Sequence, residues 1–90
     1  MKFNELPIGG IFQGVWKDEK AKYAYVWEKI AVGFYKLIDC KVRNHHGEDQ
    51  EQLSIGSIGE LDDGSESRSI EECGFELVDP SEYPKYTLEI

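Results

Sequence analysis

Short segments rich in aromatic and β-branched residues recur along this chain, and turn-forming residues separate them. We expect strands at residues 11–16, 23–30, 34–43, 53–58, 75–78 and 86–90. Five or six short strands with frequent turns are typical of a mainly β fold, either a single small barrel or a strongly bent antiparallel sheet. Because the chain has 90 residues, we expect one domain that covers residues 1–90.

One of these segments also fits a helix. Five large side chains recur at the spacing of an amphipathic helix: Tyr23, Val26, Trp27, Ile30 and Phe34. In that alternative a helix covers about residues 18–32, Asp18 caps its start, Gly33 ends it, and the fold is α+β. The residue pattern leaves both interpretations open.

The segment 34–43 alternates in a way that favours a half-buried strand. Four apolar residues are predicted to share its inner face, namely Phe34, Ile38, Cys40 and Val42. Asp39, Lys41 and Arg43 fall on the other face. Since an apolar environment raises the pKa of a thiol, Cys40 is not expected to act as a nucleophile.

Charge is divided unevenly along the chain. Residues 1–47 hold eight Lys and Arg against five Asp and Glu, whereas residues 48–90 hold two against thirteen. The balances of +3 and −11 add up to the net charge of −8. An acidic region of this strength attracts basic surfaces and repels phosphate.

The acidic residues of the second half are therefore the candidate contact residues for a partner. Neighbouring side chains on one face of a strand are about 6.5–7 Å apart, which is close to the phosphate spacing of a nucleic-acid strand. Carboxylates on a rigid sheet could thus occupy a basic channel built for DNA or RNA, while the simpler alternative is a face that only confers solubility. The candidates are Glu48, Asp49, Glu51, Glu60, Asp62, Asp63, Glu66, Glu71 and Glu72.

No residue pattern indicates catalysis, a metal or a cofactor, so we expect a protein that is not an enzyme. His45 and His46 lack a second His or Cys pair at ligand spacing. The segment 60–66 is acidic but does not match a calcium loop, and it reads instead as an Asp-Gly hairpin turn at residues 62–65. The two cysteines are too few for a disulfide scaffold, and no apolar run approaches the roughly 20 residues of a membrane span. We therefore expect a cytoplasmic protein that does not bind a membrane.

A stretch of alternating basic and aromatic residues offers a different function. Its residues Trp16, Lys20, Lys22, Tyr25 and Trp27 could stack bases and neutralise phosphates, as in small-barrel nucleic-acid binders. The competing interpretation is that these aromatic side chains form the core of the domain. The acidic half would repel phosphate, which makes direct nucleic-acid binding the less favoured expectation.

The opening sequence Phe3-Asn4-Glu5-Leu6-Pro7-Ile8-Gly9-Gly10-Ile11-Phe12, followed by Trp27-Glu28-Lys29-Ile30, resembles a group of small phage and prophage proteins. Members of this group begin F-x-x-L-x-x-G-x-x-F and often carry a charged residue where this chain has Gly10. The resemblance covers about the first third of the chain. It implies a small β-rich domain, which is why we prefer a strand at residues 23–30, and it brings no catalytic residues.

A phage or mobile-element origin, as this resemblance implies, suggests an antagonist of host nucleic-acid-handling machinery, such as an anti-CRISPR protein. Our leading expectation is a non-catalytic module that binds and inhibits a basic host protein or nucleoprotein complex through its acidic surface. The alternative within the same setting is a structural or assembly protein of the virion.

Overall fold

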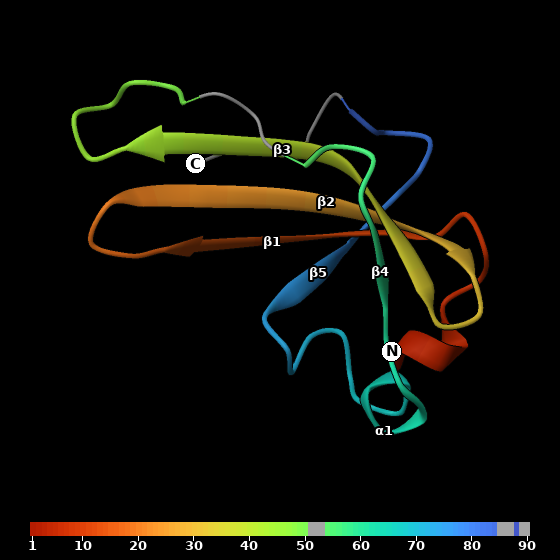
Figure 1. Cartoon of the computed structure of the whole chain (residues 1–90). Helices are drawn as coiled ribbons and strands as arrows, with labels where there is room; N and C mark the ends of the chain where they lie inside the picture. Colours follow the sequence, from red (N-terminus) through yellow and green to blue (C-terminus); the bar gives the residue numbers. More distant parts are fainter. Residues whose placement is uncertain (51–53, 85–87, 89–90) are drawn as a thin grey trace.

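The computed structural model describes residues 1–50, 54–84 and 88, and it contains one sheet of five antiparallel strands. The sheet order is β4-β3-β2-β1-β5 (Figure 1). The elements are η1 (Phe3–Glu5), β1 (Ile11–Lys17), β2 (Ala21–Ala31), β3 (Phe34–Asn44), β4 (Ile58–Glu60), α1 (Asp63–Glu66) and β5 (Phe75–Val78). The mainly β fold predicted from the sequence is confirmed in the form of a bent sheet.

The sheet is not closed into a barrel. β4 and β5 form its two edges and do not pair with each other within the described part of the chain. A gap of about 190 Å³ lies between them, and both Gly59 of β4 and Phe75 of β5 line it. Phe3 of η1 also lines this gap. The short segments η1 and α1 contact each other and lie at the end of β4 (Figure 1).

The contested segment is a strand. β2 pairs along its length with β1 on one side and β3 on the other, with registers such as Trp16↔Tyr23 and Tyr23↔Val42. Two neighbours satisfy the backbone N–H and C=O groups that a lone helix would have to satisfy internally. The helical alternative at residues 18–32 is therefore wrong.

A bulge in β3 changes which of its residues face inward. Val26 pairs with Asp39, but the next residue, Trp27, pairs with Leu37, so that Ile38 has no direct partner on β2. An extra residue of this kind shifts the alternation by one and bends the strand. Tyr35 and Leu37 are consequently buried, whereas Phe34 is 39% exposed. The predicted inner face is thus correct for Cys40 and wrong for Phe34.

The core is a cluster of aromatic rings on one face of the sheet. Phe12 of β1 contacts Phe3, Tyr35 and Phe75 edge to face, with ring centroids 5.1–5.6 Å apart. Phe3 in turn contacts Tyr35 and Phe75 at 5.9 and 6.3 Å. Ile70, which is fully buried, packs in the same cluster. Segments at both ends of the sequence thus meet on the three central strands.

Two ionisable side chains are buried beside this cluster. The ammonium group of Lys29 in β2 donates to the backbone oxygen of Phe3 at 2.8 Å, which holds η1 against the sheet. The hydroxyl of Tyr35 donates to the carboxylate of Glu66, with its oxygen 2.9 and 3.0 Å from the two carboxylate oxygens, which holds α1. Buried polar groups of this kind need such partners, because a group left without one costs free energy.

The opposite face of the sheet is covered by the segment that follows β5. Ala24 and Val26 point to this face and are almost completely buried. The backbone N–H of Leu88 donates to Oε1 of Gln13 at 3.4 Å, and the side chain of Tyr83 hydrogen-bonds with Asp39. In Figure 1 the segment after β5 accordingly turns back towards the long strands.

Two predictions for the acidic half are wrong in detail. The predicted strand at residues 53–58 is instead a turn at its described positions, where Ser54 and Gly56 have φ values of 69° and 94°, and β4 begins only at Ile58. The predicted hairpin turn at residues 62–65 is the short helix α1, because the Asp62 side chain accepts from the backbone N–H of Ser65 at 2.7 Å and caps it. Most of the strand predicted at residues 86–90 lies outside the described residues.

The packing of β5 on β1 can be tested with Gly14→Ala. A Cβ atom at Gly14 would lie 2.6 Å from the Phe75 ring, so that the ring must move. We expect a loss of about 1–3 kcal/mol in the free energy of unfolding, measured by urea titration. Gly59→Ala is the control, because its Cβ would meet only Trp27 at 3.9 Å. Equal losses in the two variants would contradict the described contact between β1 and β5.

The Tyr35–Glu66 hydrogen bond can be tested with Tyr35→Phe, which leaves a buried carboxylate without its donor. We expect a loss of about 1–3 kcal/mol at neutral pH, measured by urea titration. Burial and the carboxylate raise the pKa of Tyr35 in the folded protein. The neutral phenol of Tyr35 therefore contributes its full stabilisation below about pH 10, the ordinary pKa of tyrosine in the unfolded chain. Above that pH the contribution falls, because the unfolded chain releases the phenol proton more readily than the folded protein does.

The variant should consequently show a shallower loss of stability in alkali than the wild type. The slope should not vanish, since burial also raises the pKa values of Tyr25 and Tyr83. An unchanged alkaline slope in Tyr35→Phe would count against the buried hydrogen bond.

Candidate functional site

Most of the candidate acidic residues lie at one end of the molecule, around α1. Glu60 ends β4, Asp62 and Asp63 begin α1, and Glu71 and Glu72 lie in the turn that leads to β5 (Figure 1). Residues 58–79 contain eight acidic residues and one basic residue, Arg68, which is a balance of −7. We call Glu60, Asp62, Asp63, Glu71 and Glu72 the acidic end.

Other candidates lie elsewhere. Glu48 and Asp49 are in the loop after β3, at the far end of the long strands from α1 in Figure 1. Asp49 forms an ion pair with Nε of Arg43 at 2.8 Å, and this hydrogen bond lowers the pKa of the carboxyl group. Glu51 lies outside the described residues. The predicted set therefore does not form one patch.

Glu66 must be removed from the predicted contact surface. Glu66 is only 5% exposed, and its carboxylate accepts a hydrogen bond from the Tyr35 hydroxyl between α1 and the sheet. Asp62 instead caps α1 by accepting from the backbone N–H of Ser65, and both Asp62 and Asp63 are exposed. Among the acidic residues around α1, Glu66 thus serves the packing of the fold and not the surface.

Two carboxylates at the acidic end are held in place by hydrogen bonds. The N–H of Ser65 lowers the pKa of Asp62, and the N-terminal ammonium group, 2.8 Å away, lowers the pKa of Glu71. The hydroxyl of Ser69 also donates to Glu71, at 3.0 Å. These carboxylates are charged at neutral pH and have restricted orientations. Glu60, Asp63 and Glu72 are exposed beside them.

The other end of the molecule carries a stack of aromatic rings. Trp16 of β1 lies parallel to Tyr25 and Tyr23 of β2, with centroids 4.7 and 5.3 Å away and interplanar angles of 18° and 25°. The two tyrosine rings are 9° from parallel. The register explains this arrangement, because Trp16 is directly opposite Tyr23 and Tyr25 is on the same face. We call Trp16, Tyr23 and Tyr25 the aromatic stack.

The residues predicted for nucleic-acid binding are divided by the same register. Trp27 shares the face of the aromatic stack but packs against the core cluster, so that the core interpretation holds for it. Lys22 pairs with Lys17 and Arg43 on the opposite face. Trp16, Tyr25 and Lys20 remain on the side of the stack. Tyr23 was missing from the predicted set, although its spacing of two from Tyr25 is the signal for a shared face.

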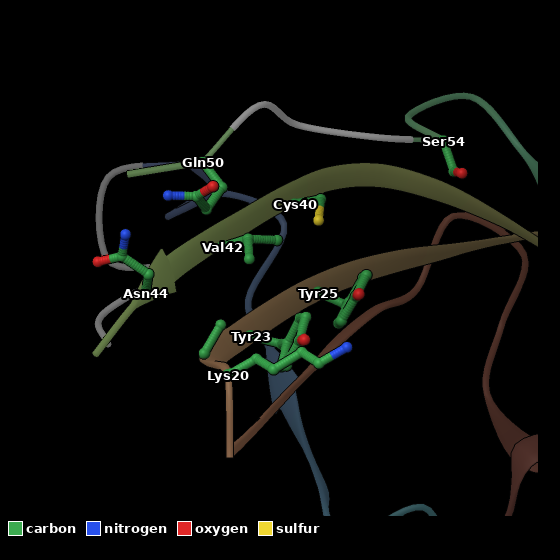
Figure 2. Close-up of a pocket in the computed structure, with 9 residues that line it drawn as sticks. Lys20, Tyr23, Tyr25, Cys40, Val42, Asn44, Gln50 and Ser54 are labelled. Carbon is green, nitrogen blue, oxygen red and sulfur yellow. The ribbon is translucent and has the colours of Figure 1, made fainter. Parts of the chain in front are cut away.

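A hollow of about 490 Å³ lies beside the aromatic stack (Figure 2). Tyr23 and Tyr25 of β2 and Cys40 and Val42 of β3 line it, and these four side chains lie on the same side of the sheet. Further lining residues are Lys20, Ala21, Asn44, Gln50 and Ser54. The volume falls within the roughly 300–1,000 Å³ typical of small-molecule sites.

The thiol of Cys40 in this hollow is not activated. Burial raises its pKa, and the nearby Asp39 carboxylate adds to this effect. The residue is 1% exposed, and both Cys40 and Cys73 are free thiols. A protonated, buried thiol contributes an apolar wall and not a nucleophile.

The described residues contain no group of three or more His, Cys, Asp or Glu side chains that could hold a metal ion. His45 and His46 are exposed, and their rings contact each other at a tilt of 42°, with centroids 4.2 Å apart. No helix in the described part of the chain has the length and apolar character needed to cross a membrane.

Comparison with protein-family models, with curated proteins and with solved structures finds no match for this chain. Two surfaces of the molecule are therefore the candidates for binding. One is the acidic end around α1, and the other is the aromatic stack with its adjoining hollow.

The contrasting environments of the two tryptophans can be tested by fluorescence quenching with acrylamide. Trp16 is 51% exposed, whereas Trp27 packs against the core. The variant Trp27→Phe emits from Trp16, and the variant Trp16→Phe emits from Trp27. The emission of Trp27→Phe should lie at longer wavelength and be quenched more strongly than that of Trp16→Phe. Stronger quenching in Trp16→Phe would mean that the assignment of Trp27 to the core is wrong.

Proposed function

We propose that this chain is a non-catalytic binding module that uses its acidic end to bind and inhibit a basic, nucleic-acid-handling protein or nucleoprotein complex. The observation that carries the proposal is the balance of −7 over residues 58–79, which fold into β4, α1, β5 and the turn between them. Seven of the eight acids are exposed, Glu66 being buried, so that with the exposed Arg68 the surface of this segment has a balance of −6. A surface of this charge matches a basic groove and repels phosphate.

Electrostatic attraction and orientation each contribute to the proposed binding. Long-range attraction between an acidic and a basic surface speeds encounter, and it weakens as salt increases. The hydrogen bonds that orient Asp62 and Glu71 reduce the entropy that is lost when these side chains meet a partner. Bound in the groove, the acidic end would compete with DNA or RNA for the same cationic side chains.

The biological setting follows from the resemblance of residues 3–12 to small phage and prophage proteins. In that setting the partner is a host factor in the cytoplasm, and an anti-CRISPR-type antagonist is one form that the inhibitor could take. What supports this part of the proposal is the short opening motif together with the acidic end.

A displacement experiment with charge-reversal variants tests the proposal. Host lysate is loaded on DNA-cellulose, and the column is washed with the purified protein at low salt. The wild type should release a defined set of DNA-bound proteins, because it competes for their basic grooves. The variant Glu60→Lys/Asp63→Lys/Glu72→Lys removes three exposed acids of the acidic end and should release at least tenfold less, measured by quantitative mass spectrometry.

The control carries the same change in charge at other places. Glu19→Lys/Glu48→Lys/Glu82→Lys replaces three exposed acids that lie away from α1. It should release the same proteins as the wild type. If the two triple variants behave alike, then net charge and not the acidic end governs the effect, and the proposed mechanism is wrong.

A further inference from the structure

The aromatic stack and the hollow beside it form a second surface that the acidic end does not use. Three nearly parallel rings lie together on this small domain, those of Trp16, Tyr23 and Tyr25. Half of the surface of Trp16 is exposed. Large aromatic side chains normally bury their area in the core of such a domain. Here the core takes Phe3, Phe12, Tyr35 and Phe75 instead, which leaves the stack without a structural role in the core cluster.

The lining of the hollow combines three kinds of chemistry. Tyr23 and Tyr25 supply aromatic surface, and Cys40 and Val42 supply an apolar wall. Asn44 and Gln50 supply side-chain amides, which can both donate and accept hydrogen bonds. Lys20 supplies a cation at the turn between β1 and β2. A flat, polar-edged ring with an attached anion matches this combination.

We propose that this hollow binds a nucleobase, with its ring against the tyrosines of the aromatic stack and its phosphate directed to Lys20. Bases in protein sites are held between aromatic and apolar side chains and are read by hydrogen bonds to their edges. Asn and Gln amides pair well with such edges, and a lysine binds phosphate as a point charge. The base belongs either to a free nucleotide or to a single-stranded nucleic acid.

The charge of the chain as a whole does not prevent this binding. The acidic end and the aromatic stack lie at opposite ends of a molecule that is 39 Å long. The Debye length is about 8 Å at physiological salt, so that the distant carboxylates are screened. Asp18, which lies close to Lys20, is already engaged, since its carboxylate accepts from the backbone N–H groups of Lys20 and Ala21 and from the Tyr23 hydroxyl.

The test measures binding of AMP, UMP and the octamers of deoxyadenylate and thymidylate, by calorimetry and by quenching of Trp16 fluorescence in Trp27→Phe. Tyr23→Ala should weaken binding by roughly fivefold to 100-fold, which is the range for loss of one stacked base. Lys20→Ala should weaken binding and reduce its dependence on salt. Lys22→Ala is the matched control, because it removes a neighbouring cation on the opposite face and should change affinity less than twofold.

Two further arms make each outcome decisive. Binding of the mononucleotides identifies a site for a single base, and binding of the octamers alone identifies a strand, and either result supports the proposal. Absence of binding by all four probes at millimolar concentration overturns it, as does binding that Tyr23→Ala and Lys20→Ala both retain. The variant Glu60→Lys/Asp63→Lys/Glu72→Lys should keep its nucleotide binding, which separates this site from the acidic end.

Discussion

Phe12 is in contact with Phe3, Tyr35 and Phe75, and this edge-to-face cluster joins parts of the chain that no local interaction could bring together. Phe3 comes from η1, Tyr35 from β3 and Phe75 from β5. Because the rings must meet on one face, the sheet bends around them and its edges β4 and β5 remain apart. The bulge at Ile38 serves the same packing, since it turns Tyr35 and Leu37 inward.

The buried polar contacts connect this core to the acidic end. Glu66 accepts a hydrogen bond from Tyr35 and so anchors α1, on which Asp62 and Asp63 are exposed. Lys29 binds the backbone of η1, whose neighbour Met1 carries the ammonium group that orients Glu71. Buried hydrogen bonds thus anchor η1 and α1, and exposed hydrogen bonds then orient the carboxylates of Asp62 and Glu71.

Strand alternation produces the two separate surfaces. At the far end of β1, β2 and β3, residues with aromatic side chains fall on one face and residues with cationic side chains, such as Lys22 and Arg43, fall on the other. Aromatic and basic residues that alternate in the sequence are thus separated onto opposite faces of the sheet, because successive side chains of a strand point to opposite sides. The aromatic stack is consequently flanked by the hollow. Among the residues that line this hollow, Lys20 is the basic one.

The sequence by itself determined the β class, the positions of β1, β2, β3 and β5, the inward direction of Cys40 and the excess of acid after residue 47. These properties depend on residue type and on spacing over a few residues, which are local. Only the tertiary structure decided the bulge at Ile38, the helix α1 in place of a hairpin, the burial of Glu66 and the separation of Trp27 from the aromatic stack. The helix α1 depends on a local cap, the Asp62–Ser65 hydrogen bond, which the Asp-Gly sequence does not distinguish from a hairpin turn. The bulge, the burial of Glu66 and the position of Trp27 depend on other elements, because the free energy of burying a ring or a charge is set by what it meets across the fold.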